Sequence, residues 1–283
     1  MNIDHDVPDV PDVPDVITRV TATGDVTAMR AVVDTLAALV AQHGTLYEWA
    51  AERPQPRALR GRAPVFVATL PDDSETVVVR HAWHGGLLAP VTGDRFRSPT
   101  RAPTEMLRSH LLRKLGIPTS EVLGFARYRA WPGLRRVDVV TRFIPDAYDL
   151  GMIASGLAPQ IDRDAALAAT KTLLVKLAAH GVIHPDLNVK NVLLRADRRA
   201  DRRGDVEALV IDVDVVQWKP DRPPLETMRA NTSRLLRSMR KWRTHFGCDV
   251  GESRMQTLEQ DCIAATPPLA TMSVSDLHRV ERV

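Results

Sequence analysis

The stretch that decides the fold reads Val182-Ile183-His184-Pro185-Asp186-Leu187-Asn188-Val189-Lys190-Asn191-Val192-Leu193-Leu194. After a charged turn comes a second stretch, Leu209-Val210-Ile211-Asp212-Val213-Asp214. Short apolar runs bounded by polar turn residues are typical of buried strands. We therefore expect a polar loop that leads into one strand, and a second strand that ends at Asp212.

Three side chains in these stretches carry the oxygen atoms that phosphoryl transfer requires. The reaction asks a protein mainly to position groups and to stabilise negative charge. Asp186 can accept the proton of an attacking hydroxyl, and Asn191 and Asp212 can supply the oxygen ligands that Mg²⁺ prefers. A loop Asp and Asn followed by a metal-binding Asp is the kinase layout. The sequence thus predicts an ATP-dependent phosphotransferase that uses ATP and Mg²⁺.

Two departures from the protein-kinase motifs narrow this prediction. Pro185 stands where the His-Arg-Asp motif has Arg, and Ile211-Asp212-Val213-Asp214 replaces Asp-Phe-Gly. An activation-loop phosphate that pairs with the missing Arg is therefore not expected. The departures favour a small-molecule or lipid-linked acceptor.

The order of expected elements is that of a two-lobed kinase. A strand, strand, helix, strand, strand pattern is typical of a kinase small lobe, and helical patterns dominate after Asp149. We predict an α+β, protein-kinase-like two-lobed fold with a β-rich small lobe and a mainly helical large lobe. The expected strands are 65–68, 76–80, 121–130, 135–143, 192–194 and 208–211, and the expected helices are 103–116, 162–180 and 225 onward.

The chain divides into three expected regions. Residues 1–22 contain the repeat Val-Pro-Asp and predict a disordered acidic, Pro-rich tail. Residues 23–145 should hold an N-terminal helix, expected from Asp25 to His43, and the nucleotide-binding small lobe. Residues 146–283 should form the catalytic large lobe, with a loose C-terminal tail after Cys262.

Five residues of the small lobe are candidates for nucleotide binding. Kinases hold the α- and β-phosphates with a cation on a strand, positioned by a Glu on the next helix. Arg80 and Glu105 have these positions. Gly61 lies either in a reduced glycine loop or in an ordinary turn, and Gly85-Gly86, with His81 and His84, either lines the acceptor site or forms a turn. Phe143 and Ile144 should offer backbone groups to adenine at the hinge between the lobes.

Composition leaves the cellular partner open. The net charge is only +3 although the pI is about 9.1, which permits an anionic partner without requiring one. Neither a basic-then-apolar leader nor a long apolar run is present, so we expect a cytoplasmic protein. The basic run Arg234 to Arg243 predicts either a solvated helix face or contact with an anionic membrane surface.

Several of these motifs resemble one known family. The loop His184 to Leu193 is similar to the catalytic loop of the lipopolysaccharide kinases, in particular those that act on 3-deoxy-D-manno-octulosonic acid (Kdo). Arg80-His81-Ala82-Trp83-His84-Gly85-Gly86-Leu87, Ile211 to Asp214, and Asn231 to Lys241 resemble three further motifs of that family. The resemblance covers roughly residues 58 to 243, and it implies that His184 and Lys190 act with Asp186 in the catalytic loop.

The resemblance also implies an acceptor. It suggests transfer of the ATP γ-phosphate to a hydroxyl of Kdo on a lipid A precursor, in lipopolysaccharide core biosynthesis. The expected partners are ATP and this glycolipid, with peripheral contact at the cytoplasmic face of the inner membrane and no nucleic acid. A related kinase with another small-molecule, lipid or protein acceptor is the alternative. A catalytically inactive nucleotide-binding scaffold is disfavoured, since Asp186, Asn191 and Asp212 are all present.

Overall fold

A computed structural model describes residues 13–53, 57–59, 64–71, 75–83, 93–97, 100–196, 206–246 and 250–266. Internal contacts divide the chain into two compact units. The first comprises Met1–His110 and Glu121–Phe143, and the second comprises Leu111–Ser120 and Ile144–Val283. We describe each unit by itself.

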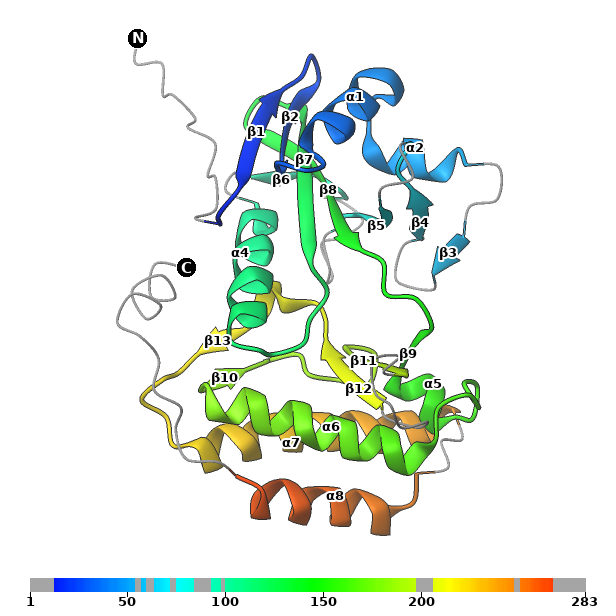
Figure 1. Ribbon diagram of the computed structural model, residues 1–283, viewed down its shortest axis with the longest axis vertical. Coiled ribbons are helices and arrows are strands. Elements are labelled where there is room, and N and C mark those ends of the chain that lie inside the picture. Colours follow the sequence, from blue (N-terminus) through cyan, green and yellow to red (C-terminus); the bar gives the residue numbers. More distant parts are fainter. Residues whose placement is uncertain are drawn as a thin grey trace. The chain divides into compact units, whose positions relative to one another are not determined.

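The first unit is built on an antiparallel sheet. Within the described part of the chain it has eight strands, in the order β1-β2-β7-β8-β5-β4-β3, with β6 also paired to β8 (Figure 1). The strands are β1 Val16–Val20, β2 Gly24–Met29, β3 Arg57–Leu59, β4 Val65–Thr69, β5 Thr76–His81, β6 Phe96–Arg97, β7 Val122–Trp131 and β8 Leu134–Arg142.

Helices cover both faces of this sheet. Helices α1 (Val33–His43) and α2 (Leu46–Ala51) share one apolar core with Val77 and Val79 of β5. Helix α4 (Arg101–Lys114) packs through Ala102 and Met106 against strands β7 and β8 in another core. Because side chains alternate along a strand, Arg80 of β5 points to the α4 face while His81 points to the α2 face.

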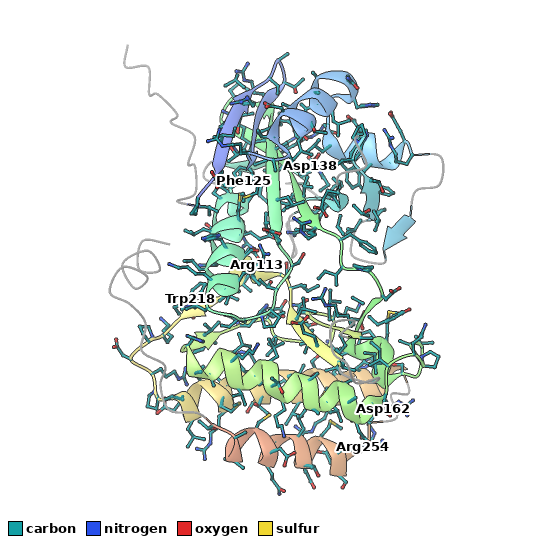
Figure 2. The ribbon with its side chains drawn as sticks, in the orientation of Figure 1. Arg113, Phe125, Asp138, Asp162, Trp218 and Arg254 are labelled. Carbon is teal, nitrogen blue, oxygen red and sulfur yellow. The ribbon has the colours of Figure 1, made fainter. Side chains whose placement is uncertain are left out.

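His81 lies in a buried ionic network on the α2 face. Its Nδ1 lies 2.6 Å from Oδ1 of Asp138, which is fully buried on β8, and its Nε2 lies 3.1 Å from Oδ2 of Asp94. The other Asp138 oxygen accepts bonds of 2.9 Å from the Tyr128 hydroxyl and the Tyr47 backbone N–H. Figure 2 shows Asp138 within this unit. The network joins α2 to the sheet, so His81 has a structural role here rather than the acceptor-lining role considered above.

The network predicts a pH-dependent stability. Burial lowers the pKa of His81, but the bonds and charges of Asp138 and Asp94 outweigh it, so the pKa is raised overall. Stability from protonated His81 is therefore complete below the unfolded-state pKa and is lost as pH rises through the raised folded-state pKa. We expect the free energy of unfolding to fall above about pH 6.5, by at most about 1.4 kcal/mol per pH unit for one proton.

Denaturant titrations between pH 6 and 9 measure this dependence. His81→Gln should flatten the part of the slope that this residue contributes. A variant whose stability has the same pH profile as the wild type would show that groups other than His81 produce the slope.

The second unit combines small sheets with helices. Strands β9 (Ala147–Asp149), β11 (Val192–Ala196) and β12 (Val206–Val210) form one sheet in the order β12-β11-β9, and β10 (Val182–Ile183) pairs with β13 (Gln217–Trp218). The helices are α5 Leu150–Ala154, α6 Arg163–Ala179, the short 3₁₀ helix Val213–Val215, α7 Pro224–Phe246 and α8 Glu252–Ala264. Helices α6, α7 and α8 lie against one another around a shared apolar core (Figure 1).

Caps and ion pairs fix the ends of these helices. Asp162 caps α6 by accepting a bond of 2.9 Å from the Ala165 N–H, as an N-cap carboxylate should. Two residues after the cap, Asp164 pairs with Arg254 of α8 at 3.2 Å. Figure 2 labels Asp162 and Arg254 at this end of the unit. The pair ties α8 to the start of α6.

Residues 111–120 belong to the second unit, although the sequence placed them in the small lobe. Leu112 and Ile117 are buried in its core. The Thr119 hydroxyl donates to the Val210 carbonyl at 2.6 Å, and the Val210 N–H donates to the Pro118 carbonyl at 3.0 Å. The segment after α4 is therefore bonded to β12.

Most of the expected elements are confirmed, including the strand pairs around α4 and helices α6 and α7. Two expectations were wrong in part. The N-terminal helix begins only at Val33, because Gly24–Met29 forms strand β2 between β1 and β7. Val16–Val20, assigned to the disordered tail, forms edge strand β1. Most of the tail expected to be loose after Cys262 lies outside the described residues.

Candidate active site

The loop between β10 and β11 presents Asp186 to solvent. Leu187 and Val189 are buried on either side of Asn188, and they anchor the loop to the core of the second unit. The Leu187 N–H donates to the His184 carbonyl at 3.1 Å, which closes a tight turn around Asp186. Asp186 itself is exposed, as a group that must meet a substrate hydroxyl has to be.

Asn191 joins this turn to the segment after β12. Its Nδ2 donates to the Asp186 carbonyl at 2.9 Å, so Oδ1 is the side-chain atom that can bind a metal. The Ile211 N–H donates to the Asn191 carbonyl at 3.0 Å, and Val192 pairs with Val210 across the strands. Asn191 and Asp212 therefore lie at the same end of the β11–β12 hairpin.

Asp212 has a left-handed backbone, with φ 62° and ψ 48°. This conformation is uncommon for a residue other than glycine, although Asp and Asn tolerate it better than most. Strained backbone of this kind persists where the surrounding structure fixes it, and it is concentrated at functional sites. The strain directs the chain from β12 into the short 3₁₀ helix directly after Asp212.

His184 is fully buried and positions the loop rather than contacting a substrate. Its Nε2 lies 3.1 Å from the Ile211 carbonyl, immediately before Asp212. Burial lowers its pKa, although the Ile211 carbonyl and the nearby Asp212 and Asp186 charges act in the opposite direction. A neutral imidazole that donates from Nε2 fits this geometry. His184 thereby ties the loop of Asp186 to the segment of Asp212.

Helix α7 holds the loop at two points. The Asn231 side chain is fully buried; its Oδ1 accepts from the His184 N–H at 3.1 Å, and its Nδ2 donates to the Val182 carbonyl at 2.8 Å. Seven residues later the Ser238 hydroxyl accepts from the Val189 N–H at 3.2 Å. Beyond their place in the family motif, no role was predicted for either residue. Two polar side chains seven apart on the apolar face of a helix are the signal that could have indicated them.

Replacing Asn231 by Ala should destabilise the second unit and loosen the loop. The change leaves the His184 N–H and the Val182 carbonyl buried without their partner, at a cost of about 1–3 kcal/mol for each group. Chemical denaturation measures the loss, and Ser233→Ala, an exposed change two residues away on the same helix, is the control. Equal stability of the two variants would contradict the anchoring role.

In the first unit, Arg80 and Glu105 form the expected pair. Nη2 of Arg80 lies 2.7 Å from Oε1 and 2.6 Å from Oε2 of Glu105. The Glu105 side chain is 9% exposed and that of Arg80 is 38% exposed, so the carboxylate is fixed while the guanidinium still reaches solvent. This is the geometry of a phosphate-binding cation positioned by a helix glutamate.

Arg80→Ala should raise the KM for ATP by roughly 10–100-fold, because a charge-assisted contact to phosphate contributes about 1.5–3 kcal/mol. Initial rates at varied ATP test this. Arg80→Lys restores the cation that kinases usually carry at this position and should recover part of the affinity. An ATP dependence unchanged in the Ala variant would assign phosphate binding to another cation.

The structure describes three of the remaining candidate residues, Phe143, Ile144 and Lys190. The division between the two units falls between Phe143 and Ile144, and the Phe143 N–H donates to the Thr76 carbonyl at 3.0 Å. Lys190 is exposed, and its Nζ lies 5.3 Å from the centre of the Trp242 ring. Gly61, with His84, Gly85 and Gly86, lies outside the described residues.

The chemistry of Asn191 and Asp212 fits Mg²⁺. One carboxylate and one amide oxygen suit this ion, which usually completes its shell with water and substrate phosphates. A cluster of three or more His, Cys, Asp or Glu side chains is absent from the described ranges.

Fold and site together define a protein-kinase-like phosphotransferase with an α+β fold: an antiparallel sheet with an Arg–Glu pair, then a mainly helical unit with the Asp–Asn loop and a following Asp. The model of the Lipopolysaccharide kinase (Kdo/WaaP) family matches residues 59–262, and the chain belongs to this family. It is therefore a kinase of lipopolysaccharide biosynthesis, and the family implies the use of ATP.

Two solved structures are similar to the chain. One, described as WaaP in complex with acyl carrier protein, is 16% identical with a TM-score of 0.46, over 79% of this chain and 84% of that one. The other, the Rio2 kinase from Chaetomium thermophilum, is 15% identical with a TM-score of 0.41, over 95% of this chain and 82% of that one. A search of curated proteins found no match.

Proposed function

We propose that this kinase transfers the γ-phosphate of ATP to a hydroxyl of Kdo on a lipid A precursor. The observation that carries the proposal is the loop of the second unit, in which exposed Asp186 is bonded through its carbonyl to Asn191, and Asn191 is bonded to the segment of Asp212. Support for Kdo as the acceptor comes from the sequence motifs, which resemble those of the Kdo kinases in particular and not only those of the family as a whole.

Each group then has one role. Asp186 accepts the proton of the acceptor hydroxyl as its oxygen forms a bond to the γ-phosphorus, and the bond from that phosphorus to the β–γ bridging oxygen breaks to release ADP. Asn191 and Asp212 would hold Mg²⁺, which neutralises charge on the phosphates when bound. The second unit would thus be the catalytic lobe.

The first unit would hold the phosphates of the nucleotide, through Arg80 positioned by Glu105. Backbone groups of Phe143 and of Ile144, the residues on either side of the division between the units, would contact adenine. A lipid-linked acceptor would place the enzyme peripherally on the cytoplasmic face of the inner membrane. No helix in the described ranges is both long enough and apolar enough to cross a membrane.

The test is ADP release from Mg-ATP with three acceptors: a lipid A precursor carrying Kdo, the same precursor without Kdo, and free Kdo. Release that requires Kdo on the lipid supports the proposal, and mass spectrometry of the product identifies the phosphorylated sugar. ATP binding without transfer to Kdo would leave the assignment as a kinase in place. The acceptor would then be another core sugar, a lipid or a protein.

A further inference from the structure

Helix α7 carries a basic stripe, Arg234, Arg237 and Lys241, at positions i, i+3 and i+7. This spacing puts the three side chains on one side of the helix. Arg237 and Lys241 are exposed and Arg234 is half-buried, with its Nη1 bonded to the Ala230 carbonyl at 3.0 Å. The segment 227–246 contains no Asp or Glu, so beyond Glu226 in its first turn the helix supplies no carboxylate of its own.

The basic stripe borders the face of α7 that holds the catalytic loop. Asn231, Ser238 and Trp242 make the contacts to that loop, through His184, Val189 and Lys190. With 100° between successive residues, positions 234, 241 and 237 lie about 40°, 60° and 100° from Ser238, all on one side. The stripe is therefore adjacent to the loop that presents Asp186.

Lys190 extends this positive charge into the loop itself. The Trp242 ring under its ammonium is fixed by a bond of 2.8 Å from Nε1 to the Ser155 hydroxyl. A Cβ on Gly151 would come within 2.9 Å of the ring, so α5 packs closely against it. The ring thus holds the Lys190 ammonium in place, and the mechanism above leaves this cation without a role.

Two other cations of these helices have carboxylate partners. Arg240, on another side of α7, pairs with Glu252 at 2.7 Å, and Arg254 pairs with Asp164. By contrast, neither Arg237 nor Lys241 makes an ion pair with any of the residues that the structure describes. The charge of Lys190 acts on the Asp149 carboxylate, whereas Arg237 and Lys241 have no such partner within the described ranges. Exposed cations of this kind beside a catalytic loop attract anions.

We propose that Lys190, Arg237 and Lys241 form a site for an anionic group of the acceptor, which orients the acceptor hydroxyl toward Asp186. The identity of the acceptor in this proposal rests on the function proposed above. Two groups of that acceptor share the required chemistry: the carboxylate of Kdo and the phosphates of lipid A. Either would be fixed at a short distance from the hydroxyl that reacts.

The first test compares two double variants of the full chain. Arg237→Gln/Lys241→Gln removes two charges from the site, whereas Arg229→Gln/Arg243→Gln removes two exposed charges from other sides of the same helix. We expect the first variant to raise the KM for the Kdo-lipid A precursor roughly tenfold, with the KM for ATP unchanged. The control should leave both constants within twofold of wild type. Lys190→Gln should also raise the acceptor KM.

Modified acceptors identify the anion. If the site binds the Kdo carboxylate, its methyl ester should remove the difference in KM between wild type and the site variant. If the site binds a lipid A phosphate, the difference in KM should instead disappear with the dephosphorylated precursor. A difference that survives both modifications would overturn the site.

The remaining outcomes are also decisive. A rise in the KM for ATP alone would assign the cations to the nucleotide. Loss of flotation on vesicles containing anionic phospholipid, with the acceptor KM unchanged in neutral detergent, would assign them to the membrane surface. Either result overturns the proposal. An active wild type with equal acceptor KM in both double variants overturns the site alone, whereas a wild type inactive on Kdo overturns the proposed function.

Discussion

Asp186→Asn is expected to lower kcat by about 10²–10⁴-fold, the usual contribution of a positioned general base. The amide keeps the size of the side chain but cannot accept the hydroxyl proton. The hydrogen bonds that shape the loop use the Asp186 carbonyl rather than its side chain, so the loop should keep its structure. Steady-state ADP release with the Kdo acceptor measures kcat, and nucleotide titration should show nearly unchanged ATP binding.

Asp221→Asn is the matched control for this variant. It removes an exposed carboxylate from the same unit, outside the loop, and should leave kcat at the wild-type value. Wild-type turnover in Asp186→Asn would require another base. Loss of ATP binding together with turnover would mean that Asp186 acts on the nucleotide.

Asp212→Asn should abolish the part of the ATP affinity that depends on Mg²⁺. Asn tolerates the left-handed backbone at this position, with φ 62°, so the charge is removed without new backbone strain. Asp212→Ala should lose the same affinity and in addition be less stable, since Ala adopts this conformation at a cost of about 1 kcal/mol or more.

Calorimetric titration of ATP with and without Mg²⁺ separates the metal effect, and thermal unfolding separates the strain. Asp212→Asn and Asp212→Ala should have the same affinity for ATP and should differ in the midpoint of thermal unfolding. If the Mg²⁺ dependence of binding survives in both, the metal is held by other residues, and Asn191 and Asp212 position the loop only.

Local signals in the sequence were sufficient to predict the central residues of the candidate active site. Asp186 and Asn191 lie in one short loop, and Asp212 follows the next strand, so chain connectivity alone brings them to one hairpin end. The pairing of Arg80 with Glu105 was also predictable, because the strand and the following helix pack face to face.

Contacts between distant residues were not predictable in this way. His184 and Asn231 are 47 positions apart, and no local pattern indicates that a buried amide will hold that loop. The N-terminal expectation failed for a related reason. Val26 and Met29 extend the helical spacing of Val33 and Leu36, yet pairing with β1 and β7 determines that Gly24–Met29 is a strand. Tertiary pairing commonly overrides such short patterns.

The two bonds from α7 to the catalytic loop have a consequence for synthesis. A nascent chain that has just passed Asp214 already contains every residue assigned here to phosphate, metal and proton transfer. It still lacks Asn231 and Ser238, whose side chains hold the loop from 47 and 49 positions away. The growing polypeptide should therefore remain inactive until α7 has left the ribosome and docked, which delays ATP turnover until the large lobe is nearly complete.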